Sequence, residues 1–151
     1  MSDMQIACFR VGDGDYAVNI LHIKEVINAV TVSRVPSAPD FVEGLIELRG
    51  AYLPLIDLRR RFGTPIEDGS TKYVIATIAG NTVALAVDSV SEVRRVASDS
   101  VQPTPALAVG PSQRFFCGVL TLDDRAVLLV DLESVLGEDE RAQLTDMATE
   151  G

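Results

Sequence analysis

The chain has 151 residues, a formal net charge of −9 at pH 7 and an apolar content of 47%. A chain of this length can bury a core, so we expect one domain or two small subdomains that share a core. Because an acidic surface repels phosphate groups, nucleic acids and membrane surfaces are poor candidate partners. From Asp123 onward nine carboxylates accompany only two arginines, and we interpret this stretch as a solvated tail.

The sequence carries no pattern typical of a targeting segment. Residues 1–10 lack a basic region followed by a long apolar core, and no run of about 18 apolar residues occurs. We therefore expect neither a signal peptide nor a membrane-spanning helix, and we expect a cytoplasmic protein. Cys8 and Cys117 both lie in apolar, strand-like contexts. Two reduced, buried thiols are the first expectation in that compartment, and a disulfide is the alternative.

The first half of the chain is typical of short strands separated by turns. Residues 5–11 alternate between polar and apolar and end at Gly12-Asp13-Gly14-Asp15, which predicts a hairpin turn. A later hairpin is predicted to turn at Arg49-Gly50. Asp57 then predicts the N-cap of a helical turn over residues 58–62.

The second half shows the same succession. Residues 72–79 predict a strand that ends in a hairpin turn at Gly80-Asn81. A later hairpin is predicted to turn at Asp123-Asp124, and residues 132–136 predict a second helical turn. The carboxylates that follow favour the start of a final helix, expected over residues 138 to about 148, through the helix dipole.

Two pairs of segments indicate an internal duplication. Residues 44–58 match residues 118–132 at an offset of 74, from Gly44 to Gly118, including the glycine at the start and the Asp-Leu at the end. Residues 16–26 match residues 83–93 at an offset of 67, from Tyr16 to Val83. The two offsets differ by seven, so the second copy is expected to carry seven additional residues after Pro103. Many short strands predict small barrels or a sandwich, and the duplication favours two barrels.

The residues that catalysis or metal binding would require are sparse. His22 is the only histidine, and between Leu21 and Ile23 it is interpreted as a surface or packing residue. One histidine and two scattered cysteines make a weak zinc site. Gly12-Asp13-Gly14 lacks the third glycine and the following helix of a dinucleotide fingerprint. We therefore predict no catalytic residue, no metal and no cofactor.

Arg59, Arg60 and Arg61 form the one cationic run of the chain. On a short helix three successive side chains fan out over most of the circumference, so a solvated face is the first interpretation. The alternative is a docking contact for an acidic partner surface.

The stretch from Val35 to Arg59 resembles the signature of CheW-like domains. That signature has a proline-bounded loop, a glycine with two apolar residues, Asn-Leu-Arg-Gly, an apolar strand with a proline, and Asp-Leu-Arg. Here Glu47 stands where the family has asparagine, so the geometry of this hairpin is expected to differ in detail. With further family-like segments the resemblance covers residues 5–140.

The resemblance implies an all-β fold with short helices. Two intertwined, five-stranded, SH3-like β-barrel subdomains would share a core. Subdomain 1 is expected over approximately residues 16–66 and subdomain 2 over approximately residues 72–132, with terminal segments completing the barrels. Residues 138–151 are expected to form a C-terminal helix and acidic tail.

The resemblance also implies a function. Family members are non-enzymatic scaffolds that bind the regulatory domain of a CheA-type histidine kinase and the tip of a chemoreceptor's helical hairpin. We expect a chemotaxis scaffold of this kind that is a monomer when isolated. A chemosensory pathway that controls pili, gliding or a second messenger is the alternative. A small-molecule-binding regulatory barrel, which would need a deep pocket with convergent polar groups, and an enzyme are the alternatives from other classes.

Three sets of site residues follow from the resemblance. Glu25 and Arg49 are expected to form an ion pair near the barrel junction. Kinase contacts are expected at the barrel ends, at Gly44, Gly50, Leu58, Arg59, Arg60 and Arg61. The segment Val101–Leu107 matches a loop that in some relatives helps to link kinase and scaffold into rings, but it carries neither a basic nor an aromatic residue here.

The third set is a row of six apolar residues expected to line one groove between the two copies. Three lie in the first copy and three at the offset of 67: Ile20, Ile23, Val26, Val87, Val90 and Val93. One interpretation is that all six fill the shared core. The other is that part of the row stays open and receives an amphipathic receptor helix. The family's receptor contacts correspond to Ile23 and Val93.

Overall fold

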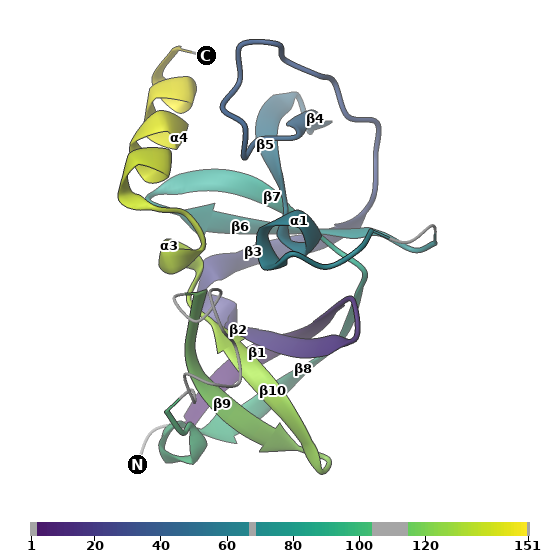
Figure 1. Ribbon diagram of the computed structural model, residues 1–151, viewed down its shortest axis with the longest axis vertical. Helices are drawn as coiled ribbons and strands as arrows, with labels where there is room; N and C mark the ends of the chain where they lie inside the picture. Colours follow the sequence, from purple (N-terminus) through teal and green to yellow (C-terminus); the bar gives the residue numbers. More distant parts are fainter. Residues whose placement is uncertain (1–2, 67–68, 104–114, 151) are drawn as a thin grey trace.

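The computed structural model of the protein describes residues 3–66, 69–103 and 115–150. Within these residues the chain forms ten strands, with short helical segments between them and one longer helix at the C-terminus (Figure 1). The strands are β1 Asp3–Val11, β2 Gly14–Asn19, β3 Ile23–Asn28, β4 Gly44–Leu48, β5 Ala51–Asp57, β6 Lys72–Ile78, β7 Asn81–Val87, β8 Ser89–Ala97, β9 Phe116–Leu122 and β10 Arg125–Val130. The helical segments are η1 Ile20–His22, α1 Leu58–Phe62, η2 Ser98–Ser100, α3 Leu132–Val135 and α4 Glu138–Glu150.

The strands form two five-stranded sheets. Sheet A has the order β8-β1-β2-β10-β9 and sheet B the order β3-β6-β7-β5-β4. In Figure 1 sheet B lies above sheet A, and α4 stands beside sheet B. The expected all-β class is therefore confirmed.

The two copies of the duplication exchange strands between the sheets. The first copy is β1–β5 and the second is β6–β10, yet β1 and β2 join sheet A whereas β3, β4 and β5 join sheet B. In the second copy, β6 and β7 join sheet B whereas β8, β9 and β10 join sheet A. The expected subdomains over residues 16–66 and 72–132 follow the copies and not the sheets, because sheet B takes residues 23–87 and sheet A takes the flanking segments. Sequence similarity identifies copies but does not reveal which strands pair.

Strand register reproduces the duplication. Ala7 pairs with Val93 in sheet A, and Val26 pairs with Val74 in sheet B, so each partner is displaced by the offset of 67. The parallel pairs Ala17 with Leu129 and Ala84 with Leu55 are related in the same way, the β2 and β7 residues by 67 and the β10 and β5 residues by 74. Residues 104–114, where the seven additional residues and part of the predicted ring loop fall, lie outside the described residues.

Each sheet is curled but not closed by a full strand ladder, so the five-stranded, SH3-like arrangement that the resemblance implies is present with incompletely closed barrels. A single antiparallel bridge joins the edges: Ser33 to Leu45 in sheet B and Gln102 to Val119 in sheet A. A glycine precedes the bridge residue in both hairpins. A Cβ atom on Gly44 would lie 2.5 Å from the Ser33 carbonyl oxygen, and one on Gly118 would lie 2.3 Å from Val101 Cγ1. The two matching glycines thus allow the backbone segments to approach closely.

Three apolar clusters form the core. The largest lies between the sheets and contains residues from both, while a smaller cluster lies on the other face of each sheet. Alternate side chains of β6 point to opposite faces of sheet B and so enter two different clusters. Val74, Ala76 and Ile78 enter the shared cluster, whereas Tyr73 and Ile75 enter the cluster of sheet B. Both faces of this strand are buried, so the two sheets depend on one common core.

Local signals in the sequence define most turns. Asp57 caps α1 by accepting a hydrogen bond from the Arg59 N–H, and Gly63 ends that helix at a φ of 74°. Arg49-Gly50 and Asp123-Asp124 have positive φ as the hairpins require. The turn after β6 is centred on Ala79 and Gly80, one residue earlier than predicted, because β7 already begins at Asn81.

The cysteines differ from the expectation in one respect. Cys8 is buried, and burial raises the pKa of its thiol, but Cys117 is exposed. Cys117 lies on β9, an edge strand of sheet A, where one face is less covered. Among the described helices, none is long and apolar enough to cross a membrane.

Candidate functional site

Glu25 and Arg49 form a two-pronged ion pair on the surface of sheet B. Arg49 Nη1 lies 2.9 Å from Glu25 Oε2, and Arg49 Nη2 donates to Glu25 Oε1 at 2.9 Å. The Arg49 side chain is exposed, and its hydrogen bond to Glu25 raises the pKa of the guanidinium. Arg49 belongs to the β4–β5 turn and Glu25 to β3, so the pair joins the two edges of sheet B.

The second copy has a different ion pair at the matching place. The positions equivalent to Glu25 and Arg49 are Glu92 and Asp123, which are both acidic. Arg94 lies between them, with Nη1 3.5 Å from Glu92 and 3.0 Å from Asp123. An arginine therefore bridges the edges in both sheets, although it comes from different strands.

Arg59 is not a surface residue but the centre of a buried polar cluster. Its side chain is 5% exposed, and its Nε and Nη2 donate to the two carboxylate oxygens of Asp57 at 3.0 Å each. Nη1 donates to Asp88 Oδ1 and to Thr71 Oγ1, both at 3.1 Å. These hydrogen bonds, those to Asp57 foremost, raise the pKa of Arg59, so its positive charge is fixed.

The same cluster links the two sheets. Asp88 lies between β7 and β8, and its Oδ2 accepts a hydrogen bond from the Gly12 N–H at 2.6 Å. Gly12 is in the β1–β2 turn of sheet A, whereas Arg59 follows β5 of sheet B. Arg59 and Asp88 thus connect the end of one sheet to a turn of the other.

Arg60 and Arg61 project from α1 in other directions. Arg60 is exposed, and its Nη1 donates to both carboxylate oxygens of Glu43 at 2.7 Å. Arg61 Nε donates to the Val135 carbonyl at 3.0 Å, and its Nη2 pairs with Glu140 of α4. The cationic run therefore serves three structural contacts, of which one lies at the surface.

The expected kinase contacts are not one surface. Leu58 is 1% exposed and belongs to the shared core, and Arg59 is buried, so neither can contact a partner directly. Gly44 is also buried, beneath the bridge to Ser33. The physical reasons differ: Leu58 packs into the core between the sheets, Arg59 links the sheets through Asp88, and Gly44 lies against the bridging strand segment at Ser33. Gly50 and Arg60 remain exposed, and Arg61 is partly so.

The six residues of the expected receptor groove fall into three classes. Val87 is fully buried in the shared core, so it cannot line an open groove; it is the last residue of β7, the central strand of sheet B. Ile23 and Val90 pack against that core and are half-buried. Val26 is 42% and Val93 is 53% exposed. The row is therefore partly core and partly surface.

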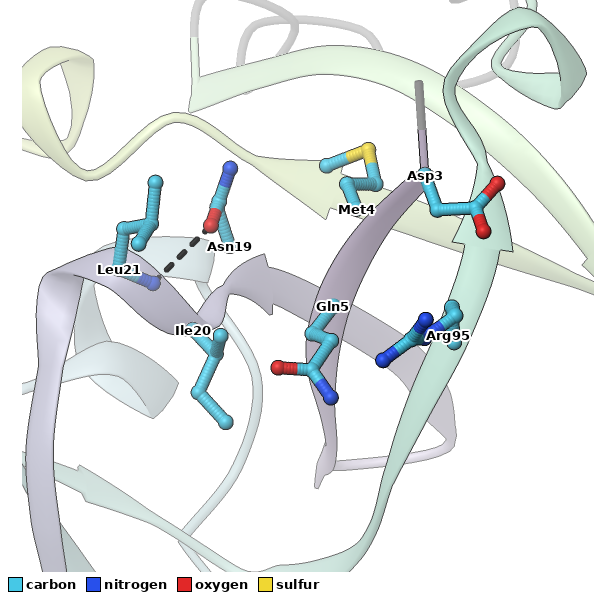
Figure 2. A pocket seen from close by; sticks show the side chains of 7 residues that line it. All are labelled: Asp3, Met4, Gln5, Asn19, Ile20, Leu21 and Arg95. Atoms are coloured by element: carbon cyan, nitrogen blue, oxygen red, sulfur yellow. Dashed lines mark hydrogen bonds between the residues drawn. The ribbon is translucent and has the colours of Figure 1, made fainter. Parts of the chain in front are cut away.

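The sixth residue, Ile20, lines a separate hollow of about 390 Å³. Figure 2 shows this hollow between the start of β1, the end of β2 with η1, and β8. Its lining residues are Asp3, Met4, Gln5, Asn19, Ile20, Leu21 and Arg95. Leu21 is 85% exposed, and its N–H donates to Asn19 Oδ1 at 3.0 Å. Apolar and charged side chains thus meet at one opening.

Three functional or structural residues were missed from the sequence: Asp88, Leu21 and Arg95. The duplication contains a signal for two of them. Leu21 stands at the position equivalent to Asp88, and a change from an acidic to an apolar residue between copies indicates different roles. Arg95 has no such signal, because its surroundings depend on the pairing of β8 with β1.

A second hollow bears on the possibility of a ligand-binding barrel. It has a volume of about 340 Å³ and includes Asp57, Arg59, Thr71 and Tyr73 in its lining. Arg59 bonds to Asp57 and Thr71, and the Tyr73 hydroxyl donates to the Val30 carbonyl at 3.3 Å. These four polar groups bond to the protein itself rather than converge on the open space, and Arg34 is a further polar residue of the lining. Within the described residues, no group of three or more His, Cys, Asp or Glu side chains is placed to hold a metal ion.

Comparison with known proteins gives one consistent result. The family model described as the CheW-like domain matches residues 5–140. "Chemotaxis protein CheW" of Rhizobium meliloti is 37% identical over 139 residues, which cover 91% of this chain and 90% of that protein. "Probable chemotaxis protein CheW" of Rhizobium etli is 35% identical over 140 residues, with the same coverage of 91% and 90%.

The fold has a counterpart among solved structures. The crystal structure of the scaffolding protein TtCheW from Thermoanaerobacter tengcongensis matches with a TM-score of 0.81. The two chains are 28% identical, and the match covers 93% of this chain and 92% of that chain. The similarity therefore extends over both sheets.

Proposed function

This chain belongs to the CheW-like domain family, and on that premise we propose that it is a chemotaxis scaffold that couples chemoreceptors to a CheA-type histidine kinase. The proposed role is non-enzymatic and cytoplasmic. The observation that carries the proposal is the match along nearly the whole length, both to chemotaxis relatives and to a structure described as a scaffolding protein.

The proposed receptor surface is formed by β3 and β8, the edge strands that carry Val26 and Val93. Val26 is directly opposite Val74, and Val93 is directly opposite Ala7. Directly opposed residues project from the same face of a sheet. Val74 and Ala7 enter the core between the sheets, so the exposed Val26 and Val93 continue that face outward. Such a site suits the apolar side of an amphipathic receptor helix.

The exposed members of the predicted kinase set are fewer than the sequence suggested, and we propose two separate contacts instead of one surface. Gly50 lies just before β5 and Arg60 lies beyond its end, with the partly exposed Arg61 next to Arg60. Gly50 is the second residue of the β4–β5 turn, and a Cβ atom there would meet nothing within 4 Å, so the backbone is open to a partner. Arg60 is held by Glu43 at the surface and presents its charge to an acidic partner.

Reconstitution of the coupled reaction tests the proposal. A CheA-type kinase and a chemoreceptor encoded in the same genome are assembled with and without this chain, and kinase autophosphorylation is measured. Receptor control of the kinase should require the chain. The Val93→Glu variant should lose this control while its affinity for the kinase regulatory domain stays within a few fold, because a charge would have to be desolvated against apolar helix side chains. Equal receptor control with and without the chain would reject the proposal.

A further inference from the structure

Nearly every cation in the described part of the chain has a partner. Most arginines and lysines form ion pairs, and others donate to neutral groups, as Lys24 does to Thr82 and Arg141 to the Glu133 carbonyl. Within the described residues, Arg34 and Arg95 are the two cations with neither a hydrogen bond nor an ion pair. The chain has a net charge of −9, so carboxylates are plentiful. These two unpaired guanidinium groups are therefore exceptions, and they are candidates for a contact with a partner.

Arg95 lies beside the proposed receptor surface. It is two residues beyond Val93 on β8, and residues two apart in a strand share a face. Arg95 pairs with Gln5 of β1, as Val93 pairs with Ala7 of the same strand. The exposed row of β8 thus runs from Val93 to Arg95 and into the hollow of Figure 2, which Ile20 and Leu21 also line.

At the matching place in the other copy the side chains make internal contacts, beside the hollow of about 340 Å³ that Arg59 and Thr71 line. Asp88 is the equivalent of Leu21 and is held by Arg59 and the Gly12 N–H. Asn28 is the equivalent of Arg95 and pairs with Lys72, the equivalent of Gln5. Leu21 is 85% exposed, and the Arg95 side chain makes no hydrogen bond or ion pair with the Gln5 side chain. The equivalents of Leu21 and Arg95 are therefore held by the protein's own side chains, whereas the side chains of Leu21 and Arg95 are not.

We infer that this hollow extends the receptor surface, and that Leu21 and Arg95 hold an apolar side chain and a neighbouring carboxylate of the bound receptor helix. This inference rests on the proposed function and adds the chemistry of the partner. A guanidinium pairs with a carboxylate through two parallel hydrogen bonds, which fixes the helix in orientation as well as in place. A helix without that carboxylate would leave Arg95 desolvated and unpaired, which is costly. The site therefore selects among receptor helices by one acidic residue.

Binding measurements with matched variants test the inference. The probe is a helical-hairpin fragment of a chemoreceptor encoded in the same genome, and calorimetry gives its affinity for the full chain. Arg95→Glu and Leu21→Asp should each weaken binding about 10-fold or more, and Arg95→Lys should weaken it less. Arg34→Glu is the control, because it makes the same charge change at the other unpaired arginine, which lies at a different hollow. It should stay within about twofold.

Reversal of charge on the probe identifies the contact. The affinity lost in Arg95→Glu should return when one acidic residue of the hairpin is changed to arginine, and that residue is the predicted partner. If Val93→Glu abolishes binding while Arg95→Glu and Leu21→Asp bind normally, the inference about the hollow is wrong, but the proposed receptor surface at Val26 and Val93 is retained. If none of the three variants weakens binding, the proposed receptor surface is wrong as well. Equal weakening by Arg34→Glu and Arg95→Glu, or weakening of kinase binding in place of receptor binding, would also overturn the inference.

Discussion

The ends of β2 and β7 occupy equivalent places in the two copies but are used differently. At the end of β7, Val87 is fully buried and Asp88 is bound to Arg59 and to the Gly12 N–H. At the end of β2, Ile20 lines a hollow and Leu21 is 85% exposed. The backbone is repeated, whereas the side chains make internal contacts at the end of β7 and stay exposed at the end of β2. Duplication thus gave two equivalent positions different surroundings.

The helical turns α1 and α3 show why the second copy needs no counterpart of the buried Arg59. Arg59 in α1 is equivalent to Glu133 in α3, and Gly12 is equivalent to Ala79. The Gly12 N–H is bound by Asp88, which Arg59 holds in place. The Ala79 N–H is bound directly by both carboxylate oxygens of Glu133, at 3.1 and 3.0 Å. Because Glu133 satisfies that turn itself, Leu21 has no structural contact to make there.

The largest expected difference between the copies is at Ile20 and Val87. Val87→Glu would bury an unpaired carboxylate in the shared core, at a cost of several kcal/mol that approaches the whole stability of a small domain. Ile20→Glu should leave the protein folded, since Ile20 borders the hollow. Urea denaturation followed by circular dichroism measures both. Similar free energies of unfolding for the two variants would contradict the contrast between the buried Val87 and the partly exposed Ile20.

Arg59 and Glu133 should show the next largest difference. Arg59→Ala leaves Asp57 and Asp88 without their counter-charge, and we expect a loss of roughly 3 kcal/mol or more in the free energy of unfolding. Glu133→Ala removes hydrogen bonds to one exposed amide and should cost about 1 kcal/mol. Thermal and chemical denaturation of both variants give the two values. Equal losses would mean that the buried cluster is no more important than its simpler counterpart.

The glycines beneath the two bridges offer a finer comparison. A Cβ atom on Gly44 would meet the Ser33 carbonyl oxygen at 2.5 Å, and this backbone atom cannot move without loss of the bridge. A Cβ atom on Gly118 would meet a Val101 methyl group at 2.3 Å, and this side chain can rotate. We expect Gly44→Ala to cost about 2–3 kcal/mol and Gly118→Ala about 1 kcal/mol. A larger loss for Gly118→Ala, measured by urea denaturation, would reverse the assignment.

The surface ion pairs should give the smallest effect. Arg49 pairs with Glu25 in one sheet, and Arg94 lies between Glu92 and Asp123 in the other. Exposed pairs are weak and are screened by salt. A double-mutant cycle on Glu25 and Arg49 should give a small coupling energy that disappears in concentrated salt. Arg94→Ala should also destabilise slightly at low salt, because it leaves two carboxylates facing each other. A coupling that persists at high salt would show that the pair is shielded from solvent.

Local signals made much of the fold predictable from the sequence. Asp57 and Gly63 define α1 through contacts within a few residues, and positive φ at Arg49-Gly50 follows from the turn type. The duplication was visible because its matches keep the order and spacing of turn residues. Such features need no knowledge of distant partners.

Long-range pairing could not be predicted in the same way. From the sequence, Arg59 is interpreted as a surface residue because it belongs to a cationic run. Its partner Asp88 lies 29 positions away in the chain. Val87 has the same spacing as the exposed Val93, but β7 is the central strand of sheet B whereas β8 is an edge strand of sheet A. Periodicity indicates which residues share a face, and only the exchange of strands between the copies decides which face is covered. The corrections at Leu58, Arg59 and Val87 have this cause, whereas Gly44 is buried by the bridge to Ser33 within sheet B.

Simultaneous binding of both partners tests the central claim most directly. The protein is mixed with the regulatory domain of a CheA-type kinase and with a chemoreceptor hairpin fragment, and sedimentation velocity gives the mass of the complexes. The account predicts one complex that contains all three components, and Val93→Glu should lose only the hairpin. Displacement of one partner by the other, or failure of both to bind, would contradict a scaffold with separate receptor and kinase surfaces.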